Sequence, residues 1–368
     1  MRSRRSVLSA LGAGVVVGLA GCTTAFSGTD SETTPASREV TDGFGRSVSI
    51  PATIDRVVGV GPGALRQIAY LDATDRVVGV EDEDESVLSA PYNQANPELR
   101  EHPVIGSAGP DAGGNSEQIL AVDPDVIFYY GEPSRADTLQ SQTDTPVVGL
   151  RIVDVTDTNA RETMYDTWRL VGDVLEKPER AETLISFLEE TIEDLEGRTS
   201  SIAVPDRKRA YVGAISYKGA HGIATTRKRF PPFEWTAIEN VASAVETDAP
   251  SVQVSSEQLL AWDPQTMFVS SANLGAVRDD VAAQPEYADL TAVDEGRTDS
   301  ILPHASYNHN YGSILANAYF VGKTVYPDHF DDVTLESKTN DIFETTLGAS
   351  LFDELTETYE AYRQLELP

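Results

Sequence analysis

Histidine, tyrosine and asparagine side chains crowd into one loop of the sequence, residues 304–312, with types and a spacing suited to ligand binding. His304 lies five positions before His309, and Tyr307 and Asn308 stand between them. Imidazoles at this spacing can ligate a metal ion directly. Because the loop follows an apolar, strand-like run and precedes a helical one, we expect it at the carboxyl end of a strand, where open α/β sheets bind ligands. Tyr307, Asn308 and His309 are therefore candidate ligand-binding residues.

A second candidate loop, residues 217–233, concentrates bases and aromatic residues in an otherwise acidic chain. Arg227 and Arg229 flank a lysine in this loop. Arginine can pair in a bidentate manner with carboxylate-like oxygens, and aromatic rings can cover a flat organic chelate. The glycines around Tyr217 and His221 suit close approach to a ligand. We predict that these four side chains contact the ligand; the alternative is a solvated basic turn whose surface ion pairs each contribute little.

Three further candidates lie in the first half of the chain. Pro62 belongs to the Gly61-Pro62-Gly63 turn that follows a predicted strand, Tyr130 ends another strand, and Tyr92 lies in a loop. The glycine turn lacks the spacing of a dinucleotide-binding motif or a P-loop. Both tyrosines are equally compatible with a position in the core or at the rim of a site.

The sequence contains no motif typical of an enzyme. It has no GxSxG, HExxH or CxxC, and no paired carboxylates at a spacing that would support a general acid and base. A bare divalent ion would be expected to recruit several histidines and a carboxylate from both halves of the chain, yet the first half contains only His102. We therefore predict no catalytic residue, no resident cofactor and no metal ion ligated by the protein.

The elements that position these loops come in two copies. The segment SEQILAVDPDVIF begins at Ser116, and SEQLLAWDPQTMF begins at Ser256, with eight of thirteen positions identical at an offset of 140. Each copy is typical of a helix that ends at Asp-Pro and is followed by a strand. A helix-turn-strand unit in each half predicts two α/β lobes with the ligand cleft between them. The alternative is chance similarity between two ordinary α/β units.

The order of the predicted elements extends this organisation to the whole chain. The hexapeptide DRVVGV occurs at residues 55–60 and 75–80 around a helical stretch, which predicts a parallel crossover. Apolar residues from Pro178 onward keep to one helical face until Gly197, a plausible stop. The predicted fold class is α/β, with two Rossmann-like lobes joined by a single long helix. We expect an N-terminal lobe at 40–158, a connecting helical region at 159–200, and a C-terminal lobe with C-terminal helices at 201–368.

The N-terminus resembles the signal of an exported lipoprotein. Residues 1–21 combine Arg4-Arg5, a short apolar core and Leu19-Ala20-Gly21 before Cys22. Cys22 is the sole cysteine of the chain, so it has no internal disulfide partner and lipidation is the simplest account of it. Residues 22–39 are rich in Thr and Ser and predict a flexible stalk. We expect a lipid-anchored protein on the extracellular face of the membrane; an uncleaved anchor helix would also tether it outside the cell.

The charge of the chain is strongly acidic. It contains 59 acids and 28 bases, and three of those bases lie in residues 1–21, where there is no acid. Such an excess indicates a solvated acidic surface adapted to high salt, as in a halophilic archaeon, and it argues against nucleic acid as a partner. The acidic run at residues 81–85 lacks the spaced ligands and turn glycine of a cation site, so we predict a charged loop there.

Several motifs together resemble a known family. The segments GPGALRQIAYL at 61–71, GAISYKGAHGI at 213–223 and YNHNYGSILANAYFVGKTVYP at 307–327, with the signal and the repeated element, are similar to the helical-backbone periplasmic binding proteins of ABC importers for iron-siderophore, haem and cobalamin. The resemblance covers residues 40–345. It implies capture of an iron(III) chelate without chemistry, a small closing motion, and delivery to a permease dimer powered by a cytoplasmic ATPase. Cobalamin, haem or a free metal ion remain alternative ligands, and a surface-anchored enzyme or sensor remains an alternative class.

The resemblance also implies a role for two glutamates. Glu117 and Glu257 occupy the same place in the two copies of the repeat. In the family, one glutamate per lobe at this position contacts a basic residue of each permease subunit. The alternative is local, because an acid in the first turn of a helix is stabilised by the helix dipole by about 0.3–1 kcal/mol.

Overall fold

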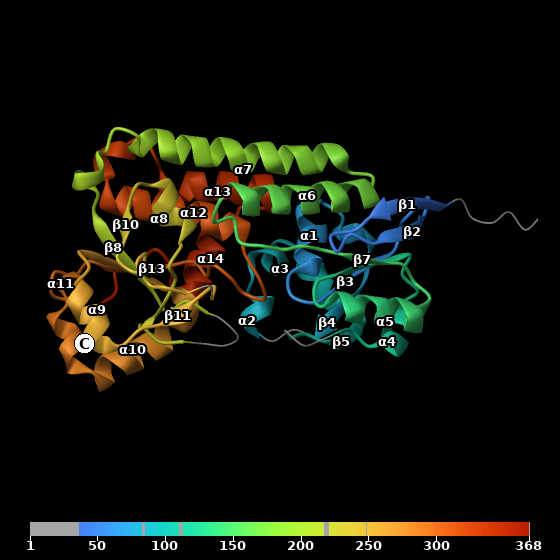
Figure 1. The fold of residues 1–368 in the computed structure, drawn as a ribbon, viewed down its shortest axis with the longest axis horizontal. Helices are drawn as coiled ribbons and strands as arrows, with labels where there is room; N and C mark the ends of the chain where they lie inside the picture. Colours follow the sequence, from blue (N-terminus) through green and yellow to red (C-terminus); the bar gives the residue numbers. More distant parts are fainter. Residues whose placement is uncertain (1–36, 83–84, 110–112, 217–220, 248, 368) are drawn as a thin grey trace, which may run out of the picture. The chain divides into compact units, whose positions relative to one another are not determined.

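The computed structural model describes residues 37–82, 85–109, 113–216, 221–247 and 249–367 (Figure 1). The predicted signal peptide, Cys22 and most of the predicted stalk lie outside these residues, as does Tyr217. In the part of the chain that is described, no helix has the length and apolar character needed to cross a membrane.

The N-terminal lobe is built on a parallel sheet with the strand order β5-β4-β3-β6-β7. Its strands are β3 (Val57–Val60), β4 (Val77–Asp82), β5 (Val104–Ser107), β6 (Val126–Tyr129) and β7 (Val147–Gly149). An antiparallel hairpin of β1 (Ser37–Thr41) and β2 (Ser47–Pro51) precedes it, so regular structure begins three residues before the predicted lobe boundary. The two DRVVGV segments form the parallel neighbours β3 and β4 around helix α1 (Ala64–Tyr70), which confirms the predicted crossover.

The C-terminal lobe repeats this plan with the strand order β10-β8-β12-β13, again with parallel pairs. Its strands are β8 (Arg209–Gly213), β10 (Glu239–Asn240), β12 (Thr266–Ser270) and β13 (Thr298–Ile301). A small antiparallel pair, β9 (Thr225–Thr226) with β11 (Val252–Gln253), lies beside β8. The remaining helices of the two lobes are α2 (Glu85–Leu88), α3 (Pro91–Ala95), α5 (Pro133–Thr143), α8 (Pro231–Trp235), α10 (Leu274–Ala283) and α11 (Thr291–Asp294).

The repeated sequence element forms the same local structure in both lobes. Helices α4 (Ser116–Val122) and α9 (Ser256–Trp262) each have seven residues and lead into β6 and β12. Each ends at an aspartate in the left-handed region, Asp123 with φ 45° and Asp263 with φ 40°, directly before a proline that cannot continue a helix. The predicted helix-turn-strand units are therefore confirmed.

One long helix connects the lobes, as predicted. This helix is α7 (Pro178–Thr199), which has 22 residues and contacts α8 and α12 (Tyr311–Val325), and α6 (Thr158–Val174) lies beside it and contacts α1 of the N-terminal lobe (Figure 1). Gly197 does not stop α7, which ends at Thr199. A single glycine costs a helix only about 1 kcal/mol, and Leu195 and Thr199 on either side of it are buried.

The C-terminal helices pack back onto both lobes. Helix α12 (Tyr311–Val325) packs against α7, α8 and α13 (Leu335–Leu347), and α13 also contacts α1 and α3 of the N-terminal lobe. Helix α14 (Phe352–Tyr359) is the last helix of the described chain. The residues after it run along β13, where the Ser300 amide donates to the Arg363 carbonyl at 2.8 Å.

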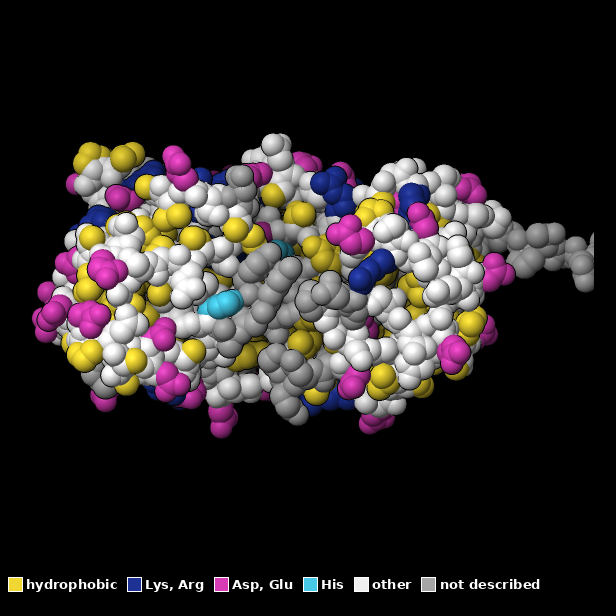
Figure 2. Space-filling view, turned by 60° about the horizontal axis from the view of Figure 1, so that its bottom comes forward, with side chains coloured by type: hydrophobic (Ala, Val, Ile, Leu, Met, Phe, Trp, Pro, Cys, Tyr) yellow, Lys and Arg dark blue, Asp and Glu magenta, His cyan; other side chains and the backbone are white. Residues whose placement is uncertain are grey.

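Acidic side chains are spread over the surface, as Figure 2 shows for one face. The acidic run at residues 81–85 was predicted to be a charged loop, but its first two residues belong to a strand. Strand β4 continues to Asp82, and Glu81 is only 5% exposed. The prediction of a solvated loop was wrong for Glu81 because the strand turns this side chain inward, toward polar partners described below.

Candidate functional site

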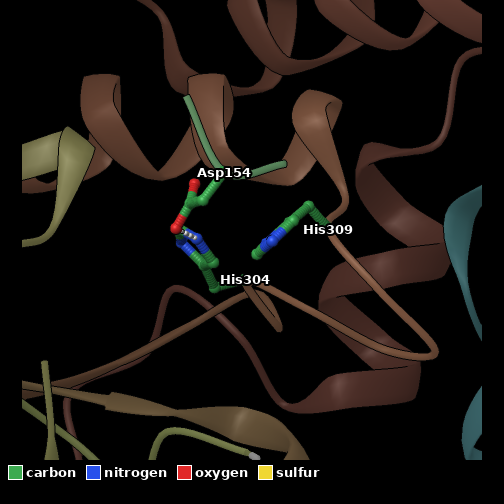
Figure 3. A group of neighbouring side chains, drawn as sticks. All are labelled: Asp154, His304 and His309. Atoms are coloured by element: carbon green, nitrogen blue, oxygen red, sulfur yellow. Dashed lines mark hydrogen bonds and ion pairs between the residues drawn. The ribbon is translucent and has the colours of Figure 1, made fainter. Parts of the chain in front are cut away.

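Three side chains that are distant in sequence form a compact polar cluster. Asp154 lies between β7 and α6, while His304 and His309 lie in the loop between β13 and α12. Figure 3 shows the three side chains pointing toward one another, and one nitrogen or oxygen atom of each lies within 4.8 Å of those of the other two. His304 Nε2 is 3.0 Å from Asp154 Oδ2. The cluster therefore joins the segment that leaves the N-terminal lobe to the loop at residues 304–312 of the C-terminal lobe.

Arg227 completes this cluster from the end of β9. Its guanidinium forms an ion pair with Oδ2 of Asp154, the same oxygen that faces His304. The side chains of Arg227 and Asp154 are only 5% and 11% exposed. Burial alone would raise the pKa of the Asp154 carboxyl, but the charge of Arg227 and the contact with His304 hold that pKa well below its usual range. Asp154 is therefore ionised.

The surroundings of both histidines favour the neutral imidazole. Burial lowers the pKa of His304, and it lowers the pKa of His309 to about 3. Because Asp154 is ionised, His304 donates through Nε2 and keeps a lone pair on Nδ1. Within the described residues, the Nδ1 atoms of His304 and His309 are buried and have no hydrogen-bond partner. Buried polar atoms are rarely left unpaired without a functional reason.

A second buried arginine, Arg66 of α1, reaches the same loop from the N-terminal lobe. Its guanidinium donates to the carbonyls of Ser306, Tyr307 (3.3 Å) and His309 (2.9 Å), and it lies 4.9 Å from the centre of the Tyr92 ring. Arg66 is 1% exposed, and no carboxylate among the described residues lies within ion-pair distance of it. A buried cation held by carbonyls and a ring is costly to desolvate, and it favours an anionic partner.

The loop is also fixed to the N-terminal lobe through Tyr307. The Tyr307 hydroxyl donates to Glu81 Oε2 at 3.0 Å and accepts from the Gly109 amide at 2.9 Å. Glu81 in turn accepts from the Gly61 amide at 3.1 Å. Tyr307 has φ 48°, a left-handed conformation that costs about 1–2 kcal/mol. The hydrogen bonds to Glu81 and Gly109 offset this cost.

Asn308 and the glycine turn after β3 fit against each other. Asn308, with φ 86°, donates from Nδ2 to the Pro62 carbonyl at 2.9 Å. Gly63 has φ 82°, and a Cβ at this position would come within 2.9 Å of Asn308 Cβ. The Gly61-Pro62-Gly63 turn therefore contacts the other lobe, and its position 63 requires glycine.

A group of aromatic side chains packs at the end of the loop where α12 begins. Tyr311, the first residue of α12, donates its hydroxyl to the Val153 carbonyl at 2.7 Å, and its ring lies 5.5 Å from that of Trp168 and 5.9 Å from that of Tyr70. Trp168 donates from Nε1 to Gln67 Oε1 at 3.0 Å. These contacts link α1, α6 and α12, and they hold the end of the loop at Tyr311 in place.

The structure brings several predicted ligand-binding residues together. Arg227 and His309 belong to the polar cluster. The Tyr307 carbonyl and the Tyr92 ring contact Arg66. Asn308 and Pro62 are hydrogen-bonded to each other across the contact between the lobes. Their contact with a ligand stays a prediction.

The other predicted residues are not among the four side chains of the cluster. Arg229 is exposed and pairs with Asp157 at 2.9 Å and Glu234 at 2.8 Å, which matches the alternative of a surface ion-pair turn. Tyr130 is half-buried beside the Gly61 turn, and His221 is half-buried next to residues outside the described part of the chain.

Asp154, Arg66 and Glu81 were not predicted from the sequence, and His304 was recognised only as a possible metal ligand. A signal did exist for Arg66, which interrupts the apolar helix at 65–71, and for Glu81, the first acid after a strand. Asp154 gave no such signal, since its partner His304 lies 150 residues away.

Glu117 and Glu257 are both exposed in the first turn of their helices, one on each lobe. The side-chain oxygens of Asn115 and Ser255 cap these helices. Glu257 also interacts with its own backbone amide and with Ser255, and these contacts lower the pKa of its carboxyl.

Comparison with known proteins identifies relatives of similar length. A family model described as "Periplasmic binding protein" matches residues 57–299. The molybdate-binding protein MolA of Haemophilus influenzae is 26% identical over 340 residues, which are 84% of this chain and 90% of the relative.

Solved structures of this kind share the fold. MolA of Haemophilus influenzae bound to molybdate superposes with a TM-score of 0.69 at 23% identity, over 85% of this chain and 98% of that chain. CeuE of Helicobacter pylori with Ni(II) bound gives 0.64 at 15% identity, over 88% and 99%. A periplasmic haem-binding protein from Pseudomonas aeruginosa gives 0.56 at 18% identity, over 75% and 94%. The predicted two-lobed α/β fold class is confirmed.

The Tyr307 contact between the lobes can be tested by removing one oxygen atom. Tyr307→Phe should lower the free energy of unfolding by about 1.5–3 kcal/mol, because it deletes a hydrogen bond to the buried Glu81 carboxylate. Tyr165→Phe is the matched control, since the buried Tyr165 hydroxyl has no partner among the described residues, and it should change stability little. Chemical denaturation of the three proteins checks this, and equal stability of Tyr307→Phe and wild type would contradict it.

Proposed function

Because the chain belongs to the periplasmic binding protein family and is a solute-binding protein of an ABC transporter, we propose that it captures an anionic solute at the Asp154 cluster. The observation that carries this proposal is the uncompensated buried charge. Arg227 is balanced by Asp154 and both imidazoles are neutral, whereas Arg66 has no carboxylate partner among the described residues. The Nε atoms of Arg66 and Arg227 are also buried donors without an acceptor in the described structure.

The solute class that these donors favour is a compact oxyanion of the molybdate type. Guanidinium N–H groups match the oxygens of such an anion, and a neutral imidazole adds a further donor. The likeness to a molybdate-binding protein over 84% of the chain supports this choice. The acidic exterior does not oppose it, because charges further apart than about 8–10 Å are largely screened in salt.

An iron(III) chelate, the ligand that the sequence motifs favoured, is the second candidate. The supporting observation is that Asp154, His304 and His309 offer one nitrogen or oxygen atom each within 4.8 Å, which suits a metal with open coordination positions. Arg227 already forms an ion pair with the Asp154 carboxylate, so a bare cation that bound Asp154 would have to break this buried ion pair. A chelate that brings its own anionic ligands avoids much of that cost.

Calorimetric titration separates these solutes. Sodium molybdate should bind saturably, and Arg227→Gln should weaken its binding by about 10- to 150-fold, since a hydrogen bond to a charged group contributes about 1.5–3 kcal/mol. Arg229→Gln, which changes an exposed arginine two positions later, is the matched control and should leave affinity unchanged. Binding of a ferric hydroxamate chelate but not of molybdate would overturn the oxyanion assignment in favour of the second candidate.

The protein acts outside the cytoplasm together with a permease and an ATPase, as its family does. We further propose that Cys22 is lipidated and tethers the protein to the extracellular face of the membrane. The motif before Cys22 supports this, and the Thr/Ser-rich residues that follow would supply reach toward the permease.

The same proposal assigns Glu117 and Glu257 to permease docking. Both are exposed at equivalent helix starts, one on each lobe, and this suits a permease of two like halves. Glu117→Ala with Glu257→Ala should leave solute affinity intact and abolish permease-stimulated ATP hydrolysis in reconstituted vesicles. Glu189→Ala with Glu193→Ala, an equal change of charge on exposed positions of α7, should preserve that stimulation. Full stimulation by the first double variant would reduce both glutamates to helix-start acids.

A further inference from the structure

The donors that would bind an anionic solute are already engaged by a carboxylate of the chain itself. Asp154 Oδ2 accepts from Arg227 and from His304 Nε2. The other carboxylate oxygen, Oδ1, accepts from the Val155 amide at 2.9 Å. Asp154 is thus fully satisfied, and it holds the site in a paired state in this structure.

The surroundings of Asp154 Oδ2 are those that an oxyanion oxygen would meet. It lies between a guanidinium and an imidazole N–H whose side chains are 5% and 2% exposed. Asp154 itself belongs to the segment between β7 and α6, whereas Arg227 and His304 both belong to the C-terminal lobe. The carboxylate therefore enters the donor group from a separate element, as a ligand would.

A second negative charge cannot share these donors cheaply. Two like charges a few ångströms apart repel strongly where water is largely excluded. An incoming anion must therefore take Arg227 and His304 away from Asp154, or bind beside an ionised carboxylate. In either case the loss of the Asp154 contacts, or the repulsion by its charge, reduces the net free energy of binding.

On this basis, and resting on the proposed anionic solute, we propose that Asp154 is an internal counter-anion that competes with the solute for Arg227 and His304 and so limits affinity. It stabilises the empty site, in which Arg227 would otherwise be a buried unpaired charge, and it lets bound solute leave again toward the permease. Asp154 is in this account a specificity-determining residue, since weakly bound anions would fail to displace it.

The substitution Asp154→Asn tests the inference because it keeps the size of the side chain and removes its charge. Affinity for molybdate, measured by calorimetry at one fixed salt concentration, should rise at least about tenfold, which corresponds to about 1.4 kcal/mol. Without molybdate the variant should melt at a lower temperature than wild type, and saturating molybdate should raise its melting temperature by more than it raises that of wild type. Structural damage at the site would lower affinity, so a gain distinguishes competition from support.

Asp157→Asn is the matched control. Asp157 lies three positions further on, pairs with the exposed Arg229 at 2.9 Å, and caps α6 by accepting from the Ala160 amide at 3.0 Å, a role that asparagine also fills. Its molybdate affinity should equal that of wild type. Unchanged or weaker molybdate binding by folded Asp154→Asn would overturn the counter-anion role while wild-type binding still upheld the proposed function. Absence of molybdate binding by wild type would overturn both.

Discussion

A guanidinium buried between the two lobes, that of Arg66, constrains the loop at residues 304–312. It donates to the carbonyls of Ser306, Tyr307 and His309, so a side chain of the N-terminal lobe satisfies backbone acceptors of the C-terminal lobe. Because a buried cation needs such acceptors, the loop must keep these carbonyls turned inward. That requirement accounts for the left-handed backbone at Tyr307, and it sets His309 against His304 with ring centres 5.8 Å apart.

The electrostatics of the site differ from those of the rest of the chain. The protein carries a formal charge of −31, yet its buried polar cluster pairs one arginine with Asp154 and leaves Arg66 without a carboxylate among the described residues. A net charge far from zero favours solubility, while interactions of buried donors are screened little by salt. The net charge of the surface and the local charge of the buried cluster are therefore separate properties of one molecule.

Much of the fold could be predicted from the sequence because its signals are local. The repeated helix-turn-strand unit, the two DRVVGV strands and the apolar face of α7 each follow from residues close together in the chain. The loop of His309 and the basic run at Arg227 were found from residue type alone. The contacts of Asp154 and Glu81 could not be, since they join residues 150 and 226 positions apart. Only the folded chain shows that one acid of the acidic run, Glu81, is buried. It also shows that Arg227 lies in the cluster while Arg229, two positions later, lies on the surface.

The proposed binding of an anionic solute beside the buried arginines of the two lobes can be observed by anomalous diffraction at the molybdenum edge, from crystals of the protein grown with molybdate. We expect one strong peak within hydrogen-bonding reach of Arg227 and the His304 and His309 imidazoles, with Asp154 displaced from Arg227. A peak confined to the protein surface, or an Asp154 to Arg227 ion pair unchanged beside bound molybdate, would contradict this proposal.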